Sequence, residues 1–381
     1  MKVKVLHVIF DLNMGGAQRV VMDHLKYFDA DHEVDVKVLV LGDDHNSIFT
    51  REAKKKHYNI EYLNANKYPS RILYFFQCLK GIYNTIRLYK PDIIHTHQTG
   101  IFKYTLLSTL LSGVKRRVHT LHSDPRAMSY FNVLIARFAF GFLKVLPICL
   151  NIEQAKQAMT IYRIKHYEVI PNGVDLDLIS STEVSRQEAR KRFQMSDEQF
   201  VVGCVGTLRP VKNFLFALEI FNELTKVRPE SVMVVVGDGP QREVLERKII
   251  ELGLQDKVRM VGNQKNVELF YKAFDVLLVT SIYESFSLVT LEAQINNVKC
   301  IVSKAVPESV FISNQGMRID LSEPKKNWVQ GIIGDKSNIN TSNSKEDFDY
   351  KACNGRLKDL YFVLINTDLG KNQVIERGLG C

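Results

Sequence analysis

Short runs of consecutive apolar residues alternate with segments of helical periodicity along most of the chain, and this alternation occurs twice. A run that is apolar at nearly every position fits a strand covered on both faces, as the strands of parallel sheets are. The predicted strands are 3–10, 34–41, 92–95, 117–122, 145–150 and 168–171 in the first half, and 200–206, 231–237, 258–262, 276–280 and 299–303 in the second. Predicted helices between them include 17–28, 213–227 and 266–274. The pattern predicts an α/β fold of two doubly wound, Rossmann-like parallel-sheet domains.

A polar stretch at 175–199 separates the two alternating halves. We therefore expect an N-terminal domain at 1–174 and a C-terminal domain at 175–354, and a length of 381 residues allows each to bury its own core. The polar region 322–350 is predicted to be a mobile loop. Ligands of open α/β sheets bind beyond the carboxyl ends of the strands, so two such domains predict a cleft between them.

Composition and the apolar segments indicate a cytosolic protein. Of the residues, 45% are hydrophobic, and the six cysteines form no C-x-x-C pair, which favours reduced thiols over disulfides or a zinc site. The first residues fit a strand better than a signal peptide. The longest apolar stretch, 127–145, is interrupted by Asn132, Arg137 and Lys144, so no membrane-spanning helix is expected.

Positive charge is concentrated in one block. Residues 51–150 contain 16 Lys and Arg but 4 Asp and Glu, whereas the whole chain has a net charge of +9. The block includes the candidate amphipathic helices 101–117 and 128–144. Basic residues interleaved with large apolar ones suit an anionic membrane surface, and the alternative is a pair of buried helices with solvated ends. Nucleic acid is not expected, because no recognisable nucleic-acid motif accompanies the charge.

Two glycines, Gly15 and Gly16, lie between the first predicted strand and the first predicted helix. They let the backbone approach a ligand closely, and a helix N-terminus favours an anion. The segment is not the G-x-G-x-x-G pattern of nicotinamide-binding domains. A tight strand-to-helix turn without a ligand is the alternative interpretation.

Arg209 and Lys212 precede the predicted helix that starts at 213. Cations at a helix N-terminus are unfavourable unless an anion neutralises them, so the pair indicates a bound phosphate. At the equivalent place after the next strand, Gly237 and Asp238 form a turn that suits a loop with or without a ligand.

Glu284 follows a predicted strand, and Glu292 lies within the next helix among apolar neighbours. A carboxylate in such surroundings is costly unless a donor satisfies it, and sugar or ribose hydroxyls are suitable donors. The free N–H groups of 285–289 could hold a phosphate. A structural salt bridge is the alternative.

Four histidines, His95, His97, His119 and His122, lie on or just after two neighbouring predicted strands. They alternate faces of an extended chain, and no carboxylate or cysteine supports them as ligands, so we expect no metal site. His119 is expected in the core. His122 is the better candidate for contact with a substrate.

Together these residues resemble the retaining glycosyltransferases of the GT-B fold usually called family 4, over residues 1 to about 315. Gln18 replaces the acid of the family's G-G-A-E-R signature. Thr207 stands where the family often has Arg, and 297–299 replaces its Gly-x-Pro turn. The segments that carry the resemblance are Gly15-Gly16-Ala17-Gln18-Arg19, Thr120-Leu121-His122, 169–175, Lys212-Asn213 and the Glu284/Glu292 pair with its E-x7-E spacing.

The resemblance implies an acceptor-binding N-terminal domain, completed by a helix within 355–381, and a nucleotide-sugar-binding C-terminal domain. It implies that His122, Lys212 and Glu284 are catalytic. The implied acceptor-binding residues are Gly15, Gly16, Arg19 and His122. The implied donor-binding residues are Gly16, Arg209, Lys212, Gly237, Asp238, Gln264, Glu284, Ser285, Phe286, Ser287, Leu288, Val289 and Glu292.

The expected reaction is retaining, metal-independent and cofactor-free transfer of a hexose-type sugar. A UDP- or GDP-sugar is the expected donor, and a glycan or polyprenyl-diphosphate-linked molecule is the expected acceptor, in cell-surface polysaccharide synthesis. The basic block places the protein on the inner face of the cell membrane, as a peripheral protein. Two alternatives remain, a nucleotide-sugar 2-epimerase of the same architecture and a non-catalytic glycan-binding protein.

Overall fold

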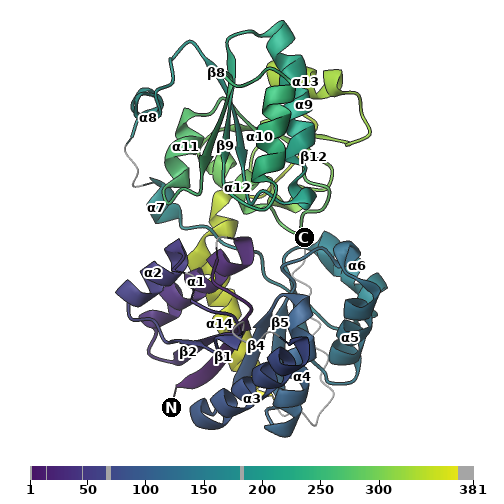
Figure 1. Ribbon diagram of the computed structural model, residues 1–381. Coiled ribbons are helices and arrows are strands. Elements are labelled where there is room, and N and C mark those ends of the chain that lie inside the picture. Colours follow the sequence, from purple (N-terminus) through teal and green to yellow (C-terminus); the bar gives the residue numbers. More distant parts are fainter. Residues whose placement is uncertain (1, 14, 45, 66–69, 181–183, 368–381) are drawn as a thin grey trace.

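The computed structural model describes residues 2–13, 15–44, 46–65, 70–180 and 184–367, which form two α/β domains, one above the other in Figure 1. Each domain has one parallel sheet, with the strand orders β3-β2-β1-β4-β5-β6-β7 and β10-β9-β8-β11-β12-β13. All pairings within the sheets are parallel, so the predicted fold class is confirmed.

The strands of the N-terminal domain are β1 (Val3–Ile9), β2 (Val34–Val40), β3 (Ile60–Tyr62), β4 (Ile93–His97), β5 (Arg116–Thr120), β6 (Leu146–Cys149) and β7 (Glu168–Val169). Its helices are α1 (Gly16–Asp29), α2 (Ile48–Lys55), α3 (Arg71–Tyr89), α4 (Phe102–Leu111), α5 (Tyr130–Gly141) and α6 (Ile152–Tyr162). One apolar core joins α1 and α2 to one face of the sheet, and another joins α3 and α4 to the opposite face.

The strands of the C-terminal domain are β8 (Phe200–Val205), β9 (Ser231–Val236), β10 (Val258–Gly262), β11 (Val276–Val279), β12 (Lys299–Ser303) and β13 (Gly316–Ile319). Its helices are α7 (Leu176–Ser180), α8 (Arg186–Arg192), α9 (Phe214–Val227), α10 (Arg242–Glu251), α11 (Val267–Ala273), α12 (Leu288–Ile295) and α13 (Lys325–Ile333). The cores lie between the sheet and α9, α10 and α13 on one face, and between the sheet and α8, α11 and α12 on the other.

The region 322–350 is the loop that its polar composition predicts at 335–344, but not throughout. It contains α13, whose Trp328 is fully buried and whose Val329 and Ile332 belong to the same core. The indole of Trp328 packs edge-to-face on Phe216 of α9, with ring centroids 5.7 Å apart. Burial of these apolar side chains therefore stabilises α13. The helix is difficult to predict from the sequence because the residues around it are polar.

The last described helix, α14 (Tyr350–Asn366), returns from the C-terminal domain to the N-terminal one, as Figure 1 shows in yellow. Its Leu357, Leu360 and Tyr361 belong to the core between α1 and the first sheet. Arg116 also donates a hydrogen bond of 2.6 Å from Nε to the carbonyl of Leu364.

Two segments of the chain cross between the domains side by side. The N–H of Val174 donates to the carbonyl of Phe348 (2.8 Å), and the N–H of Tyr350 donates to the carbonyl of Val174 (2.9 Å). A Cβ atom on Gly173 would lie 2.4 Å from Cα of Tyr350, so only glycine fits there without a shift of the backbone. The connection between the domains is thus a paired ribbon.

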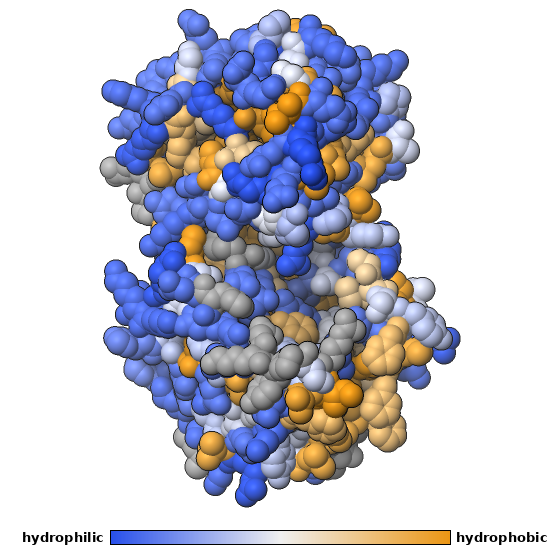
Figure 2. All heavy atoms as spheres, viewed as in Figure 1, coloured by the Kyte–Doolittle hydropathy of each residue, from blue (hydrophilic) through white to orange (hydrophobic). Residues whose placement is uncertain are grey.

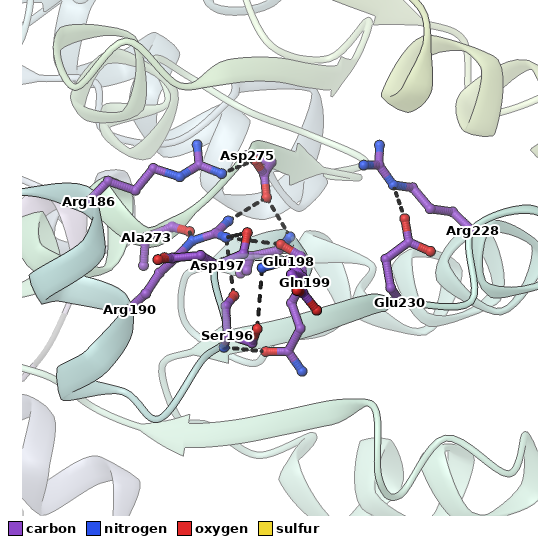
Figure 3. Close-up of polar contacts among 11 residues, drawn as sticks. Arg186, Arg190, Ser196, Asp197, Glu198, Gln199, Arg228, Glu230, Ala273 and Asp275 are labelled. Atoms are coloured by element: carbon purple, nitrogen blue, oxygen red, sulfur yellow. Dashed lines mark hydrogen bonds and ion pairs between the residues drawn. The ribbon is translucent and has the colours of Figure 1, made fainter.

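A buried arginine fixes α8 to the sheet of the C-terminal domain (Figure 3). Arg190 is 1% exposed and donates to the carbonyls of Ala273, Asp197 and Gln199, at 2.8–3.2 Å. Its Nη2 donates to the carboxylate of Asp275 at 2.7 Å. Every part of this buried charge is therefore compensated, which is the condition under which such a group is tolerated.

Candidate active site

A cavity of about 260 Å³ lies between the two domains, beyond the carboxyl ends of their strands. Figure 2 shows the hollow between the upper and lower parts of the molecule. The N-terminal domain contributes the start of α1 and the segment after β5, and the C-terminal domain contributes the segments after β8, β9, β10 and β11. The predicted site residues that line it are Gly15, Gly16, Arg19, His122, Lys212, Gly237, Gln264, Glu284, Ser285, Phe286, Ser287, Leu288, Val289 and Glu292.

Arg209 and Asp238 are not among the lining residues. The side chain of Arg209 is exposed to solvent, and the following 3₁₀ turn (Pro210–Lys212) brings the lysine rather than the arginine to the cavity. Asp238 accepts a hydrogen bond from the N–H of Gly239 (2.8 Å) and faces Arg242 at 3.5 Å. Its carboxylate is thus bonded within its own turn. This agrees with the alternative interpretation, a turn that needs no ligand.

Gly206 and Gly237 hold two loops of the cavity together. Their φ angles are +149° and +132°, and a Cβ atom on Gly237 would lie 2.0 Å from the carbonyl oxygen of Gly206. Such close packing is open to glycine alone. These residues therefore shape the cavity wall through their backbone.

Lys212 and Glu284 form an ion pair in the wall of the cavity. Nζ of Lys212 donates to Oε2 of Glu284 at 2.7 Å, and both side chains are mostly buried. The two residues come from the segments after the neighbouring strands β8 and β11. An ammonium group has three donors, so Lys212 can keep this bond and donate to an anion as well.

Glu292 lies deeper, on α12, where the hydroxyl of Tyr271 donates to its Oε2 at 2.8 Å. Burial raises the pKa of the Glu292 carboxyl, although Arg19 across the cleft and the bond from Tyr271 both favour its ionised form. Burial opposes the charge of Arg19, but the carboxylates of Asp23 and Glu292 outweigh it and raise the pKa of the guanidinium. Arg19 is ion-paired with Asp23 of its own helix at 3.3 Å, and its charge also favours the ionised form of Glu292 across the cleft.

The N-terminus of α12 opens onto the cavity with an unusual backbone. Ser287, its N-cap residue, has φ 75°, a left-handed conformation that costs a residue with a side chain on the order of 1 kcal/mol or more. The hydroxyl of Ser287 bonds that of Thr290 (2.8 Å) and does not cap the helix. The N–H of Thr290 donates to the carbonyl of Ser287 (3.1 Å), whereas the N–H groups of Leu288 and Val289 are available to an anion.

Sequence reasoning missed several lining residues, above all Tyr271, Asn172 and Asp175. Burial opposes ionisation of Asp175, but the hydrogen bond from Lys26 of α1 outweighs it and lowers the pKa of Asp175. Asn263 and Lys265 also line the cavity, and their place just after a predicted strand was a signal that could have found them.

His95, His97 and His122 lie in one row, whereas His119 lies apart from it, bonded to Thr96 and packed on Phe102. His7 and His24, which sequence reasoning missed, join His95 and His97, while His119 is in the core as predicted. Nδ1 of His97 is 2.8 Å from Nε2 of His122, and Nε2 of His97 is 2.9 Å from Nδ1 of His7. Burial lowers the pKa of His7 and of His122 to about 3, so these imidazoles are neutral.

Ring nitrogens of His7, His24 and His97 lie within 4.8 Å of one another, a spacing that a metal ion could use. Both nitrogens of His7 and both of His97 already take part in hydrogen bonds. A metal ion there would have to displace some of these bonds, so the row fits a hydrogen-bonded network better than a set of free ligands.

Comparison with known proteins assigns the family. Residues 14–178 match the family described as Glycosyltransferase Family 4, and residues 185–331 match the one described as Glycosyl transferases group 1. The two matches cover one domain each and leave only a short gap between them. The chain therefore belongs to the GT-B glycosyltransferases of family 4.

Relatives and solved structures agree with this assignment. The Bacillus subtilis protein EpsF, which carries a glycosyltransferase name, is 24% identical over 86% of each chain. The UDP-Gal:alpha-D-GlcNAc-diphosphoundecaprenol alpha-1,3-galactosyltransferase of Escherichia coli is 27% identical, over 75% of this chain and 79% of its own. The crystal structure of HepE from Anabaena in complex with UDP-glucose superposes with a TM-score of 0.77 at 21% identity, over 94% of this chain and 99% of that one. This likeness confirms the predicted GT-B fold.

Proposed function

We propose that this protein is a retaining hexosyltransferase that moves a sugar from a UDP- or GDP-sugar to a glycan or polyprenyl-diphosphate-linked acceptor. The observation that supports the proposal most directly is the convergence of Lys212, Glu284 and the start of α12 on one cavity between the domains. A relative named for UDP-Gal and a diphosphoundecaprenol acceptor supports a UDP-sugar and a lipid-linked acceptor. The polymer would be a cell-surface polysaccharide such as capsule, exopolysaccharide or O-antigen.

On the donor side, we assign the diphosphate to Lys212 and to the N–H groups of 285–289, with Gly16 at the start of α1 facing it. Glu284 holds the transferred sugar. Glu292 accepts bonds from the ribose hydroxyls, and the bond from Tyr271 orients its carboxylate. Positive charge and helix N-termini then stabilise the negative charge that develops on the leaving group.

On the acceptor side, Gly15, Arg19 and His122 line the opposite wall of the cavity, on the N-terminal domain. In the reaction, the bond between the sugar C1 and the phosphate oxygen breaks while C1 bonds to the acceptor oxygen. The acceptor proton passes to the leaving phosphate, on the same face of the sugar. This front-face route retains the configuration without a carboxylate nucleophile on the other face of the sugar.

The test is binding followed by turnover. Thermal-shift measurements with UDP-, GDP-, ADP- and CMP-sugars identify the donor, because a specific ligand raises the melting temperature. Proton NMR of the product formed with a polyprenyl-diphosphate glycan then reports its anomeric configuration. Retention supports the proposal. Inversion, conversion of the sugar nucleotide without an acceptor, or binding without turnover would each contradict it.

We further propose that transfer needs neither a divalent metal ion nor an organic cofactor, because Lys212 and the start of α12 supply positive potential at the diphosphate. Activity should survive exhaustive treatment with EDTA. Loss of activity on chelation, with recovery on addition of Mg²⁺ or Mn²⁺, would contradict this.

Finally, we propose that the N-terminal domain docks on the anionic inner face of the cell membrane. Tyr130, Phe131 and Phe142 of the α5 region are 77%, 64% and 73% exposed, and Figure 2 shows apolar side chains gathered on the lower domain at the right. Exposed Lys115 and Lys144 flank this region in the chain. No helix in the described part of the chain is both long and apolar enough to span a membrane.

Co-sedimentation with liposomes tests the docking. Binding should require anionic lipid and should weaken with added salt. The double variant Phe131→Asp/Phe142→Asp should lose binding, while Ile250→Asp, at an exposed apolar residue of α10, should keep it. Equal binding to neutral and anionic vesicles would contradict the electrostatic part of the proposal.

A further inference from the structure

A continuous row of hydrogen bonds runs from the cleft to the returning helix α14. We call His122, His97, His7 and Tyr361 the histidine chain. The successive distances are 2.8 Å from His122 Nε2 to His97 Nδ1, 2.9 Å from His97 Nε2 to His7 Nδ1, and 3.3 Å from His7 Nε2 to the hydroxyl of Tyr361. Only His122 lines the cavity.

Each member of the chain constrains the next one. His7 and His97 are fully buried, and burial lowers their pKa, so each ring is a neutral imidazole with one N–H donor and one lone pair. A ring that accepts at one nitrogen must therefore donate at the other. It follows that only two arrangements satisfy every bond, and they run in opposite directions along the chain.

The contacts of Tyr361 distinguish these two directions. Its hydroxyl lies 2.6 Å from Nδ1 of His95 but 3.3 Å from Nε2 of His7. Bonds donated by a hydroxyl are shorter than those donated by N–H, so the distances assign the hydroxyl proton to the bond with His95. His95 then donates from Nε2 to the hydroxyl of Thr120, which is 2.7 Å away.

The remaining protons follow from this one. His7 donates from Nε2 to the oxygen of Tyr361, and its Nδ1 accepts from Nε2 of His97. Nδ1 of His97 in turn accepts from Nε2 of His122. His122 is thereby left with an unprotonated Nδ1, and no other described residue is hydrogen-bonded to that atom.

We propose that Tyr361, through the histidine chain, fixes His122 in the tautomer that offers its Nδ1 lone pair to a hydroxyl group of the bound substrate. The site of this contact rests on the proposed function, whereas the tautomer does not. A reversed His122 would set its Nε2 lone pair against the Nδ1 lone pair of His97, and such an unmade bond costs the desolvation of both groups. Tyr361 touches no substrate and is a positioning residue.

The direct test reads the tautomers without any substrate. Protein labelled with ¹⁵N in its histidine rings gives long-range ¹H–¹⁵N spectra that report which nitrogen carries the proton. Wild-type His122 should carry it on Nε2. In Tyr361→Phe, the Nδ1–H form of His122 should gain a measurable population, because the hydroxyl that sets the direction is gone.

Tyr162→Phe is the matched control, because Tyr162 is buried in the same domain and its hydroxyl contacts no described histidine. It should leave the tautomer of His122 unchanged. A wild-type His122 protonated on Nδ1, or a tautomer that Tyr361→Phe does not alter, would overturn the proposal. The tautomer of wild-type His122 tests the proposal even if Tyr361→Phe folds poorly.

Kinetics separates a positioning role from a general structural one. Tyr361→Phe should lower kcat/KM by about 3- to 10-fold, the effect of one weakened hydrogen bond. In a His122→Ala background the same change should have no further effect. An equal loss in both backgrounds would overturn the proposal. If the wild type shows the expected tautomers but transfers no sugar, the result would contradict the proposed function and leave the tautomer proposal supported.

Discussion

Lys212 and Glu292 approach the cleft from the same domain, yet their substitution should change different kinetic constants. Negative charge on the diphosphate grows as the glycosidic bond breaks, so the bond from Lys212 strengthens in the transition state. We expect Lys212→Ala to lower kcat by about 10²- to 10³-fold, as loss of an oxyanion donor does. Lys226→Ala, on the surface of α9 beside Glu223, is the control and should have no effect.

Glu292→Gln should instead raise the KM for the donor and leave kcat nearly unchanged. The ribose carries little change of charge during the reaction, so a bond to it contributes equally to the ground state and the transition state. Steady-state kinetics with the identified donor measures both constants. An unchanged KM in Glu292→Gln, together with a change of KM alone in Lys212→Ala, would mean that the assigned roles are wrong.

Much of the candidate site could be predicted because it follows the ends of predicted strands. Lys212 and Glu284 lie in the segments that follow two such strands, and the structure brings both to the cavity. Tyr271 could not be found in this way, because it lies on a helix and reaches the site only through its bond to Glu292. Tyr361 could not be predicted either, because its contacts with His7 and His95 join residues more than 260 positions apart in the sequence.

Among the elements, α8 depends on one buried charge. Arg190→Met keeps the apolar stem but removes the guanidinium, which leaves the carbonyls of Asp197 and Gln199 and the carboxylate of Asp275 without that partner (Figure 3). We expect the free energy of unfolding of the C-terminal domain to fall by about 3–5 kcal/mol. Denaturant unfolding measures this.

Arg192→Met, two residues farther along α8 and exposed, is the control for that substitution and should change stability by less than about 0.5 kcal/mol. Equal stability of the two variants would show that the buried network contributes nothing.

The paired ribbon between the domains should tolerate no side chain at Gly173. In Gly173→Ala the new methyl group would collide with the backbone of Tyr350, so the two crossing segments must separate. We expect a loss of about 1–3 kcal/mol in the free energy of unfolding. Gly141→Ala, where the added Cβ meets nothing within 4 Å, should leave stability unchanged or slightly higher. A Gly173→Ala protein as stable as Gly141→Ala would contradict this account.

The strands and helices also differed in how well the sequence predicted them, and burial explains the difference. The long apolar strands were predictable because burial on both faces leaves a continuous apolar run. The short edge strands β3 and β13 were missed, since an edge strand is only partly covered and carries polar residues such as Glu61 and Arg318. The segment 101–117 was predicted as one helix, but α4 ends at Leu111 and Arg116 begins a strand.

At the scale of the whole molecule, the buried histidines should make the fold sensitive to acid. Burial lowers the pKa of His7 and of His119 to about 3, from 6.5 in an unfolded chain. Between these values the unfolded chain binds protons that the folded one does not, so stability falls as the pH decreases from about 6.5 to 3. Each such histidine contributes about 1 kcal/mol per pH unit. Burial raises the pKa of Asp23 to about 6 and also raises the pKa of Glu292 and of Glu168, so these carboxyl groups act in the opposite direction.

Denaturant unfolding at pH 7 and pH 5 measures this effect. His119→Gln should flatten the dependence on pH, whereas His32→Gln, at an exposed residue, should leave it as in the wild type. A free energy of unfolding that is the same at both pH values would contradict the prediction.

The return of α14 also determines the order in which the molecule can be completed during translation. The core beneath α1 includes Leu357 and Tyr361, which leave the ribosome only after the whole C-terminal domain has been made. The domain that is synthesised first is therefore finished last, while every strand of the second sheet lies in the one uninterrupted segment 185–333. Until the last helix arrives, apolar surface of the nascent first domain stays exposed to water and to chaperones.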